Sequence, residues 1–124
     1  MSTPAETATP TDLATKVADL MLDKHGSDIM VMDLRGVTSV TDYFVLCSCD
    51  SDVQVKAVVG HLNDTLRDEG LRPLHIEGQD QLSWVILDYV NVVAHVFMGP
   101  TREYYGLERL WADAPVVVVS DEAS

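Results

Sequence analysis

Residues 83–97 read SWVILDYVNVVAHVF and predict the centre of the fold. Two apolar runs, Ser83 to Asp88 and Val92 to Phe97, flank the short segment Tyr89-Val90-Asn91. Runs of this length on either side of a brief interruption are typical of two strands joined by a tight turn. The stretch therefore predicts an antiparallel pair of strands, and the rest of the chain is interpreted outward from it.

Side chains alternate between the two faces of the first strand. Trp84, Ile86 and Asp88 share one face, and Val85 and Leu87 share the other. If Val85 and Leu87 belong to the core, Trp84 lies on a partly open face, where tryptophan is typical of a binding hot spot. The alternative is that Trp84 packs beneath a helix, since tryptophan is usually well buried.

His95 interrupts the otherwise apolar strand Val92 to Phe97. A metal ligand would need partners, and neither the other histidines nor the cysteines are spaced as ligands with it. A hydrogen-bonded histidine of the core or of an interface is therefore favoured. The sequence predicts no metal site.

The segment before this pair predicts a helix and two strands. Apolar positions at helical spacing indicate a helix capped by Thr11 or Asp12 and ended by a left-handed Gly26. Two short apolar runs follow, Ile29 to Leu34 and Tyr43 to Cys47. Runs with so few polar residues are expected of strands that are covered on both faces.

A second helix is predicted to begin at Ser51. Ser51 and Gln54 have the spacing of a capping box, in which each side chain satisfies the other residue's backbone N–H. The apolar stripe of this helix runs to Gly70, and Gly60 within the stripe indicates close packing. A short strand, Leu74 to Ile76, is expected next.

The region after Gly99-Pro100 predicts a final helix that Gly106 splits into two short turns. Val116 to Val119 is either a further strand or an adherent tail. The order of elements predicts an α/β fold with a mixed sheet of about five strands and packed helices. The expected organisation is a flexible N-terminal tail (1–11), a single domain (12–112) and a C-terminal tail (113–124).

The chain of 124 residues carries a net charge of −12, with 20 acidic and eight basic side chains. Such a surface should repel nucleic-acid phosphates, so direct binding of nucleic acid is not expected. It would attract a basic protein, although a need for solubility gives the same bias. No apolar run is long enough to span a bilayer, and the first dozen residues do not resemble a targeting peptide.

Cys47 and Cys49 are separated by one residue, so both should point to the same face of a strand. This geometry suits two reduced thiols better than a disulfide, which favours a reducing cytoplasm.

An enzymatic alternative rests on three carboxylates. Asp50 and Asp52 at a helix start, with Asp88 at a strand end, could hold Mg²⁺ and a nucleotide phosphate. Asp and Ser are, however, also preferred at helix starts for capping. No Walker loop, nucleophile elbow or zinc helix appears. The sequence therefore favours a protein that is not an enzyme.

Six blocks, read together and in order, resemble the ribosomal silencing factor (Iojap) family over residues 13–111. The blocks are Thr41-Asp42-Tyr43-Phe44-Val45, Gln54-Val55-Lys56-Ala57-Val58, Glu77-Gly78, Trp84 with Asp88, His95-Val96-Phe97, and Arg102 with Tyr105, Leu107-Glu108 and Leu110-Trp111. The chain departs from the family where many members have Ser-Gly, here Ser48-Cys49, and where Val53 replaces a basic residue. Both departures lie in the loop where a transferase would grip phosphate.

The resemblance implies a nucleotidyltransferase-like fold with no catalytic residues and no cofactor. It also implies a cytoplasmic homodimer that binds a large-subunit ribosomal protein of the L-fourteen type. Bound there, the protein would sterically block the small subunit and repress translation under nutrient limitation. A magnesium-dependent nucleotidyltransferase-like enzyme is the alternative.

The matched blocks supply the predicted partner-binding residues, which are Trp84, Asp88, His95, Arg102, Tyr105, Glu108 and Trp111. Trp84 is the expected apolar anchor, and Asp88 and Glu108 are expected to pair with Lys or Arg of the partner. Tyr105 and Trp111 would extend the patch or fasten the last helix to the sheet.

Overall fold

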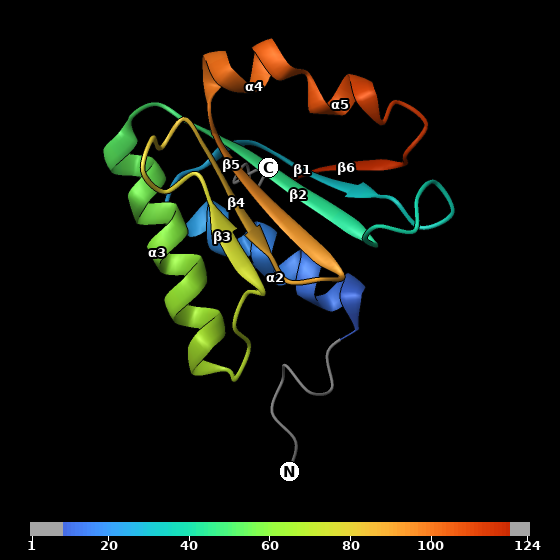
Figure 1. Ribbon diagram of the computed structural model, residues 1–124, viewed down its shortest axis with the longest axis horizontal. Helices are drawn as coiled ribbons and strands as arrows, with labels where there is room; N and C mark the ends of the chain where they lie inside the picture. The colour runs from blue at the N-terminus through green and yellow to red at the C-terminus, as the bar shows by residue number, and fades with distance from the viewer. Residues whose placement is uncertain (1–8, 120–124) are drawn as a thin grey trace.

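The computed structural model describes residues 9–119, which form a mixed sheet of six strands with helices on both faces (Figure 1). The strand order is β3-β4-β5-β2-β1-β6. Among the strands of residues 9–119, only β2 and β5 pair in parallel, and the other neighbours are antiparallel. The elements are α2 (Pro10–Asp23), β1 (Ser27–Asp33), β2 (Tyr43–Cys49), α3 (Asp52–Asp68), β3 (His75–Glu77), β4 (Trp84–Asp88), β5 (Val92–Met98), α4 (Gly99–Tyr105), α5 (Leu107–Leu110) and β6 (Val116–Val119).

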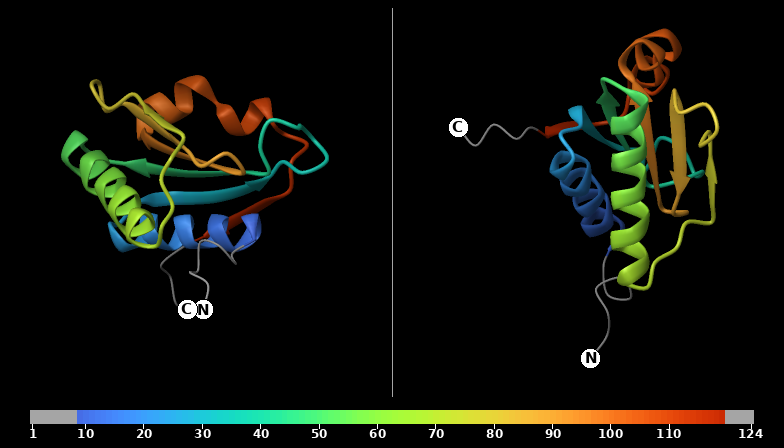
Figure 2. Two further views of the ribbon diagram at one scale, coloured as in Figure 1. Left: turned by 60° about the horizontal axis from the view of Figure 1, so that its bottom comes forward. Right: turned by 90° about the vertical axis from the view of Figure 1, so that its left-hand side faces the viewer.

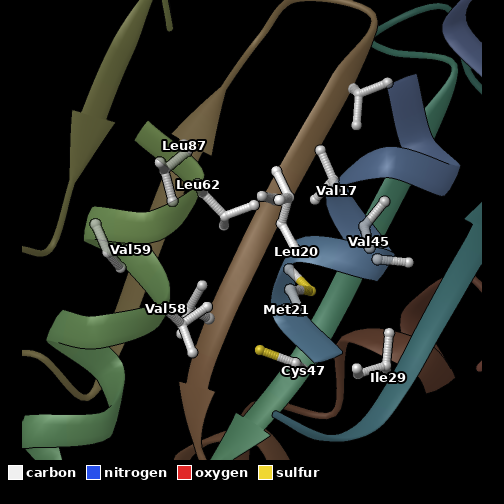
Figure 3. Packing of buried hydrophobic residues seen from close by; sticks show 14 of the residues in the cluster. Val17, Leu20, Met21, Ile29, Val45, Cys47, Val58, Val59, Leu62 and Leu87 are labelled. Atoms are coloured by element: carbon white, nitrogen blue, oxygen red, sulfur yellow. The ribbon is translucent and has the colours of Figure 1, made fainter. Parts of the chain in front are cut away.

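The main core lies between the sheet and the two long helices, α2 and α3 (Figure 3). Met21 of α2 and Leu62 of α3 are fully buried in this core, together with Val45 of β2. Cys47 and Cys49 belong to the same core as free thiols, as two residues on one strand face should. Burying these side chains is what holds the helices on this face.

The start of α2 lies earlier than the sequence predicts. The cap is Thr9, whose hydroxyl accepts a hydrogen bond from the backbone N–H of Asp12 at 3.1 Å. Asp12 returns the contact through its carboxylate at 3.3 Å, so the two residues form a capping box. Pro10 begins the helix because a first-turn residue needs no N–H donor.

The prediction that a left-handed Gly26 ends α2 is wrong. His25 adopts the positive φ of 64°, and Gly26 donates its N–H to the carbonyl of Met21 at 3.0 Å. A Cβ at position 26 would lie 3.2 Å from the Cβ of Cys47. Glycine is therefore needed for the close approach of this turn to β2.

The start of α3 is capped as predicted at Ser51, which accepts from the N–H of Gln54 at 3.1 Å. The Gln54 side chain does not return the contact to Ser51. Its oxygen accepts from Asp50 N–H at 2.7 Å, and its amide donates to the carbonyls of Lys24 and His25 at 3.2 and 2.8 Å. Gln54 therefore ties the start of α3 to the end of α2.

Gly60 is not a site of close packing, contrary to the prediction, because a Cβ there would meet nothing within 4 Å. We expect Gly60→Ala to raise the free energy of unfolding by about 0.5–1 kcal/mol, since alanine has the higher helix propensity. Urea unfolding measures this change. Gly26→Ala is the matched control and should lower stability, because its new Cβ would crowd the Met21 carbonyl at 3.0 Å. Equal effects of the two substitutions would contradict this account.

The predicted antiparallel pair is confirmed as β4 and β5, with Trp84 opposite Phe97 and Asp88 opposite Val93. The sheet has six strands rather than about five, because Val116–Val119 pairs with β1. This strand falls within the predicted C-terminal tail. Of the two predicted tails, residues 1–8 and 120–124 lie outside the described part of the chain. No helix within residues 9–119 is both long and apolar enough to cross a bilayer.

Candidate functional site

The second face of the sheet is only partly covered. The short helices α4 and α5 lie on this face, opposite α2 and α3 (Figure 2). They close a smaller core built on Leu46 and Phe97, and Phe44, Trp84 and Trp111 pack at its margin partly buried. The predicted alternation of β4 is confirmed, because Val85 and Leu87 are fully buried on the other face while the intervening side chains are partly exposed here.

Trp84 lies at the border between the covered and the open part of this face. Its ring stacks on Phe97 with centroids 4.9 Å apart and meets the Tyr105 ring of α4 at 5.0 Å. The indole Nε1–H donates to Nδ1 of His95 at 3.0 Å. Trp84 is therefore held against the end of α4 and still presents part of its surface to solvent, which combines the two alternatives that the sequence left open.

His95 lies beneath this surface, with only 4% of its area exposed. Its ring meets Phe44 edge to face with centroids 4.5 Å apart. Because Nδ1 accepts from Trp84, the ring proton must reside on Nε2. That Nε2 is buried without a hydrogen-bond partner in the described structure. An unpaired buried donor typically costs about 1–3 kcal/mol.

Burial lowers the pKa of His95 to about 3, from an ordinary value of 6.5. Below pH 6.5 the unfolded chain therefore binds a proton at His95 that the folded chain does not bind. The contribution of His95 to the free energy of unfolding is fully present above pH 6.5 and is lost as the pH decreases towards 3. We expect His95 to contribute a loss of about 1.4 kcal/mol per pH unit, or about 2 kcal/mol between pH 6.5 and 5.

Urea unfolding of the wild type and of His95→Phe at several pH values measures this contribution. Other titrating groups cancel in the difference between the two proteins, so the difference alone should follow the slope. Parallel pH profiles for the two proteins would show that His95 titrates normally in the fold.

Arg102 is buried, with 6% of its area exposed, and it joins three parts of the structure. Its Nε donates to Glu108 of α5 at 3.0 Å. Its Nη1 donates to the carbonyl of Asp28 at 2.6 Å and to the hydroxyl of Ser48 at 3.0 Å. These contacts fasten α4 and α5 to β1 and β2. Arg102 and Glu108, each predicted to bind the partner, are therefore paired with each other within the chain.

The helices α4 and α5 carry exposed apolar side chains. Tyr105 is 56% exposed, and Tyr104 and Leu110 are 80% and 72% exposed. Trp111 is partly buried, with its ring 6.2 Å from that of Phe44. Helical spacing alone does not reveal this exposure, because periodicity does not show that α4 and α5 leave one side uncovered.

Acidic groups border the open part of the face. Asp88 accepts from Val90 N–H at 2.7 Å, which shapes the turn after β4. The neighbouring strand β3 brings His75, whose Nε2 lies 2.8 Å from Glu77 and 3.8 Å from Asp88. The sequence reasoning missed Glu77 and His75 as part of this border. Their register opposite β4 is the signal that could have identified them.

The three carboxylates of the enzymatic alternative do not converge. Asp50 follows the end of β2, whereas Asp88 lies opposite Val93, at the level of Phe44 near the start of β2. The stretch of β2 from Phe44 to Cys49 spans about 16 Å, so Asp50 and Asp88 lie at opposite ends of the sheet. In residues 9–119, no group of three or more His, Cys, Asp or Glu side chains could hold a metal ion.

Comparison with known families identifies the relatives of this chain. The family model "Ribosomal silencing factor during starvation" matches residues 7–124. The chain belongs to the ribosomal silencing factor family. A ribosomal silencing factor of Bacillus subtilis is 42% identical over 94 residues, which cover 76% of this chain and 80% of that protein. The mouse protein named for mitochondrial assembly of the ribosomal large subunit is 32% identical over 98 residues, which cover 77% of this chain and 43% of that protein.

Solved structures agree with the family. A crystal structure of a Chromobacterium violaceum protein aligns with a TM-score of 0.81 at 27% identity, covering 94% of this chain and 97% of that one. A crystal structure of a Bacillus halodurans protein aligns with a TM-score of 0.72 at 32% identity, covering 88% of this chain and 96% of that one. The α/β fold of this silencing factor is thus shared with solved proteins, and the family name points to a regulatory factor rather than an enzyme.

Proposed function

We propose that this silencing factor docks on a basic protein of the large ribosomal subunit, of the L-fourteen type, and sterically blocks association with the small subunit. Translation would thereby be repressed when nutrients are limiting. The observation that carries the proposal is the incompletely covered face at Trp84, with the exposed Tyr105 beside it. Exposed aromatic clusters on a soluble protein are typical of protein interfaces.

The proposed docking face consists of Trp84, Ile86 and Asp88 of β4, Glu77 of β3, Tyr104 and Tyr105 of α4, and Trp111. Its chemistry fits a basic partner, because the aromatic side chains lie beside the Glu77 and Asp88 carboxylates and the whole chain carries −12. Exposed charge pairs contribute only about 0–1 kcal/mol each and mainly accelerate association. The aromatic side chains would therefore supply most of the affinity.

Two further parts of the proposal concern the state of the protein. We propose that it acts in the cytoplasm, binds no nucleic acid directly, and forms a homodimer. The acidic surface supports the second point, since it repels phosphates. Light scattering coupled to size-exclusion chromatography tests the dimer, and a monomer at micromolar concentration would overturn that part.

Cosedimentation with purified large subunits tests the central proposal. We expect the protein in the large-subunit peak at low salt, and less of it as salt screens the acidic border. Adding small subunits to the loaded large subunits should then yield fewer joined ribosomes, as read by light scattering. Absence from the large-subunit peak, or unchanged subunit joining by loaded subunits, would overturn the proposal.

A further inference from the structure

We propose that His95 is a positioning residue. It accepts the only side-chain hydrogen bond that Trp84 can donate, so that the partner meets the indole ring and not its N–H. The group that fits such a ring is the cationic side chain of a basic protein. This inference rests on the proposed docking face. It assigns His95 to the support of that face, beneath the residues that would touch the partner.

The first step is that Trp84 has no donor left for a partner. An indole carries one N–H and no acceptor. That N–H already donates to His95 Nδ1 at 3.0 Å. An acceptor group on the partner could pair with Trp84 only by breaking this bond. The surface that Trp84 offers is therefore the exposed part of its aromatic ring.

The second step is that the acceptor on His95 is fixed. The ring is wedged between Phe44, at 4.5 Å, and Phe97, on which it stacks at 6.0 Å with an interplanar angle of 13°. Burial keeps it uncharged at ordinary pH, because the pKa of His95 is lowered to about 3. One neutral tautomer therefore presents Nδ1 to Trp84 in every molecule.

The third step is that the histidine carries a cost that an apolar ring would not. The Nε2–H of His95 is buried with no acceptor among the described groups. An apolar ring at position 95 would avoid that cost and would fill similar space beside Phe44, but it would leave the Trp84 N–H without its acceptor. What the histidine supplies, and an apolar ring would not, is the acceptor that orients Trp84.

The fourth step concerns what the oriented ring can bind. Phe97 stacks on one face of the ring, so a Lys or Arg of the partner would meet the part of the ring that stays exposed, and the attraction grows when water is excluded. Glu77 of β3 lies opposite Ile86, two residues from Trp84, and Asp88 lies four residues and about 13 Å along β4. These carboxylates would take further basic side chains of the partner.

The positioning is tested in the free protein by NMR of the ¹⁵N-labelled indole N–H groups, assigned with Trp111→Phe. We expect His95→Phe to accelerate deuterium exchange at Trp84 Nε1–H at least tenfold. His95→Asn, whose side-chain oxygen can replace Nδ1, should stay within about threefold of wild type. The free energy of unfolding of His95→Phe at pH 7 is measured as well, so that exchange through global unfolding can be subtracted. Unchanged exchange in His95→Phe would overturn the positioning role.

The partner chemistry is tested by cosedimentation with large subunits. We expect Trp84→Phe, which keeps a ring and lacks the N–H, to weaken docking less than tenfold, and Trp84→Ala to weaken it about 30-fold or more. His95→Phe should weaken docking at least fivefold, with recovery in His95→Asn. Equal losses for Trp84→Phe and Trp84→Ala would show that the N–H makes the contact. If wild type does not bind large subunits, the proposed function fails, while the exchange experiment still judges His95.

Discussion

Trp84→Ala is expected to weaken docking on the large ribosomal subunit by about 30-fold or more. An aromatic anchor that is buried on binding typically contributes about 2 kcal/mol or more, and each 1.4 kcal/mol is a factor of ten. Trp84 fits that role because its ring is already held by Phe97, Tyr105 and His95, so little side-chain freedom is lost on binding. Titrated cosedimentation gives the affinity ratio.

A matched truncation shows whether the loss is specific. Val53 is 73% exposed at the start of α3, on the other face of the sheet, so Val53→Ala should dock within about twofold of wild type. Asp88→Asn should have a smaller effect than Trp84→Ala and should act mainly on the association rate and its salt dependence. A folded Trp84→Ala protein, judged by circular dichroism, that docks like wild type would refute the anchor.

The alternation of Trp84, Val85, Ile86 and Leu87 was enough to predict which face of β4 belongs to the core, because a strand has only two faces. The pairing of β4 with β5 and the helix break at Gly106 also depend on residues close together in the sequence, and both predictions are confirmed. The sixth strand was left open, since valines favour a strand but do not show that the edge of β1 is free to pair.

The roles of individual site residues depended on contacts that sequence spacing does not contain. His95 and Arg102 lie in matched blocks, which placed them with the binding residues. The fold buries both of them, one under Trp84 and the other under α5. Polar residues that support a face and residues that form it share the same sequence blocks, and only burial and hydrogen bonds separate the two groups.

Arg102→Met is expected to lower the free energy of unfolding by about 2–4 kcal/mol. The substitution keeps an unbranched stem but removes the donors that satisfy the Asp28 carbonyl and the buried Ser48 hydroxyl. It also leaves Glu108 unpaired, but the Glu108 side chain is 31% exposed and can be hydrated. The loss should therefore fall below the 3–5 kcal/mol typical of breaking a fully buried pair. Urea unfolding at pH 7 measures it.

Arg109→Met is the control, because Arg109 is exposed and makes one long hydrogen bond, to the carbonyl of Glu103 at 3.3 Å. Its stability should stay within about 0.5 kcal/mol of wild type. Arg102→Lys should be intermediate, since lysine keeps the charge but not the planar fork of donors. Because Arg102 fastens α4, loosening it should also displace Tyr105 from Trp84 and weaken docking while the protein is still folded. Wild-type stability in Arg102→Met would show that the helices are held by apolar packing alone.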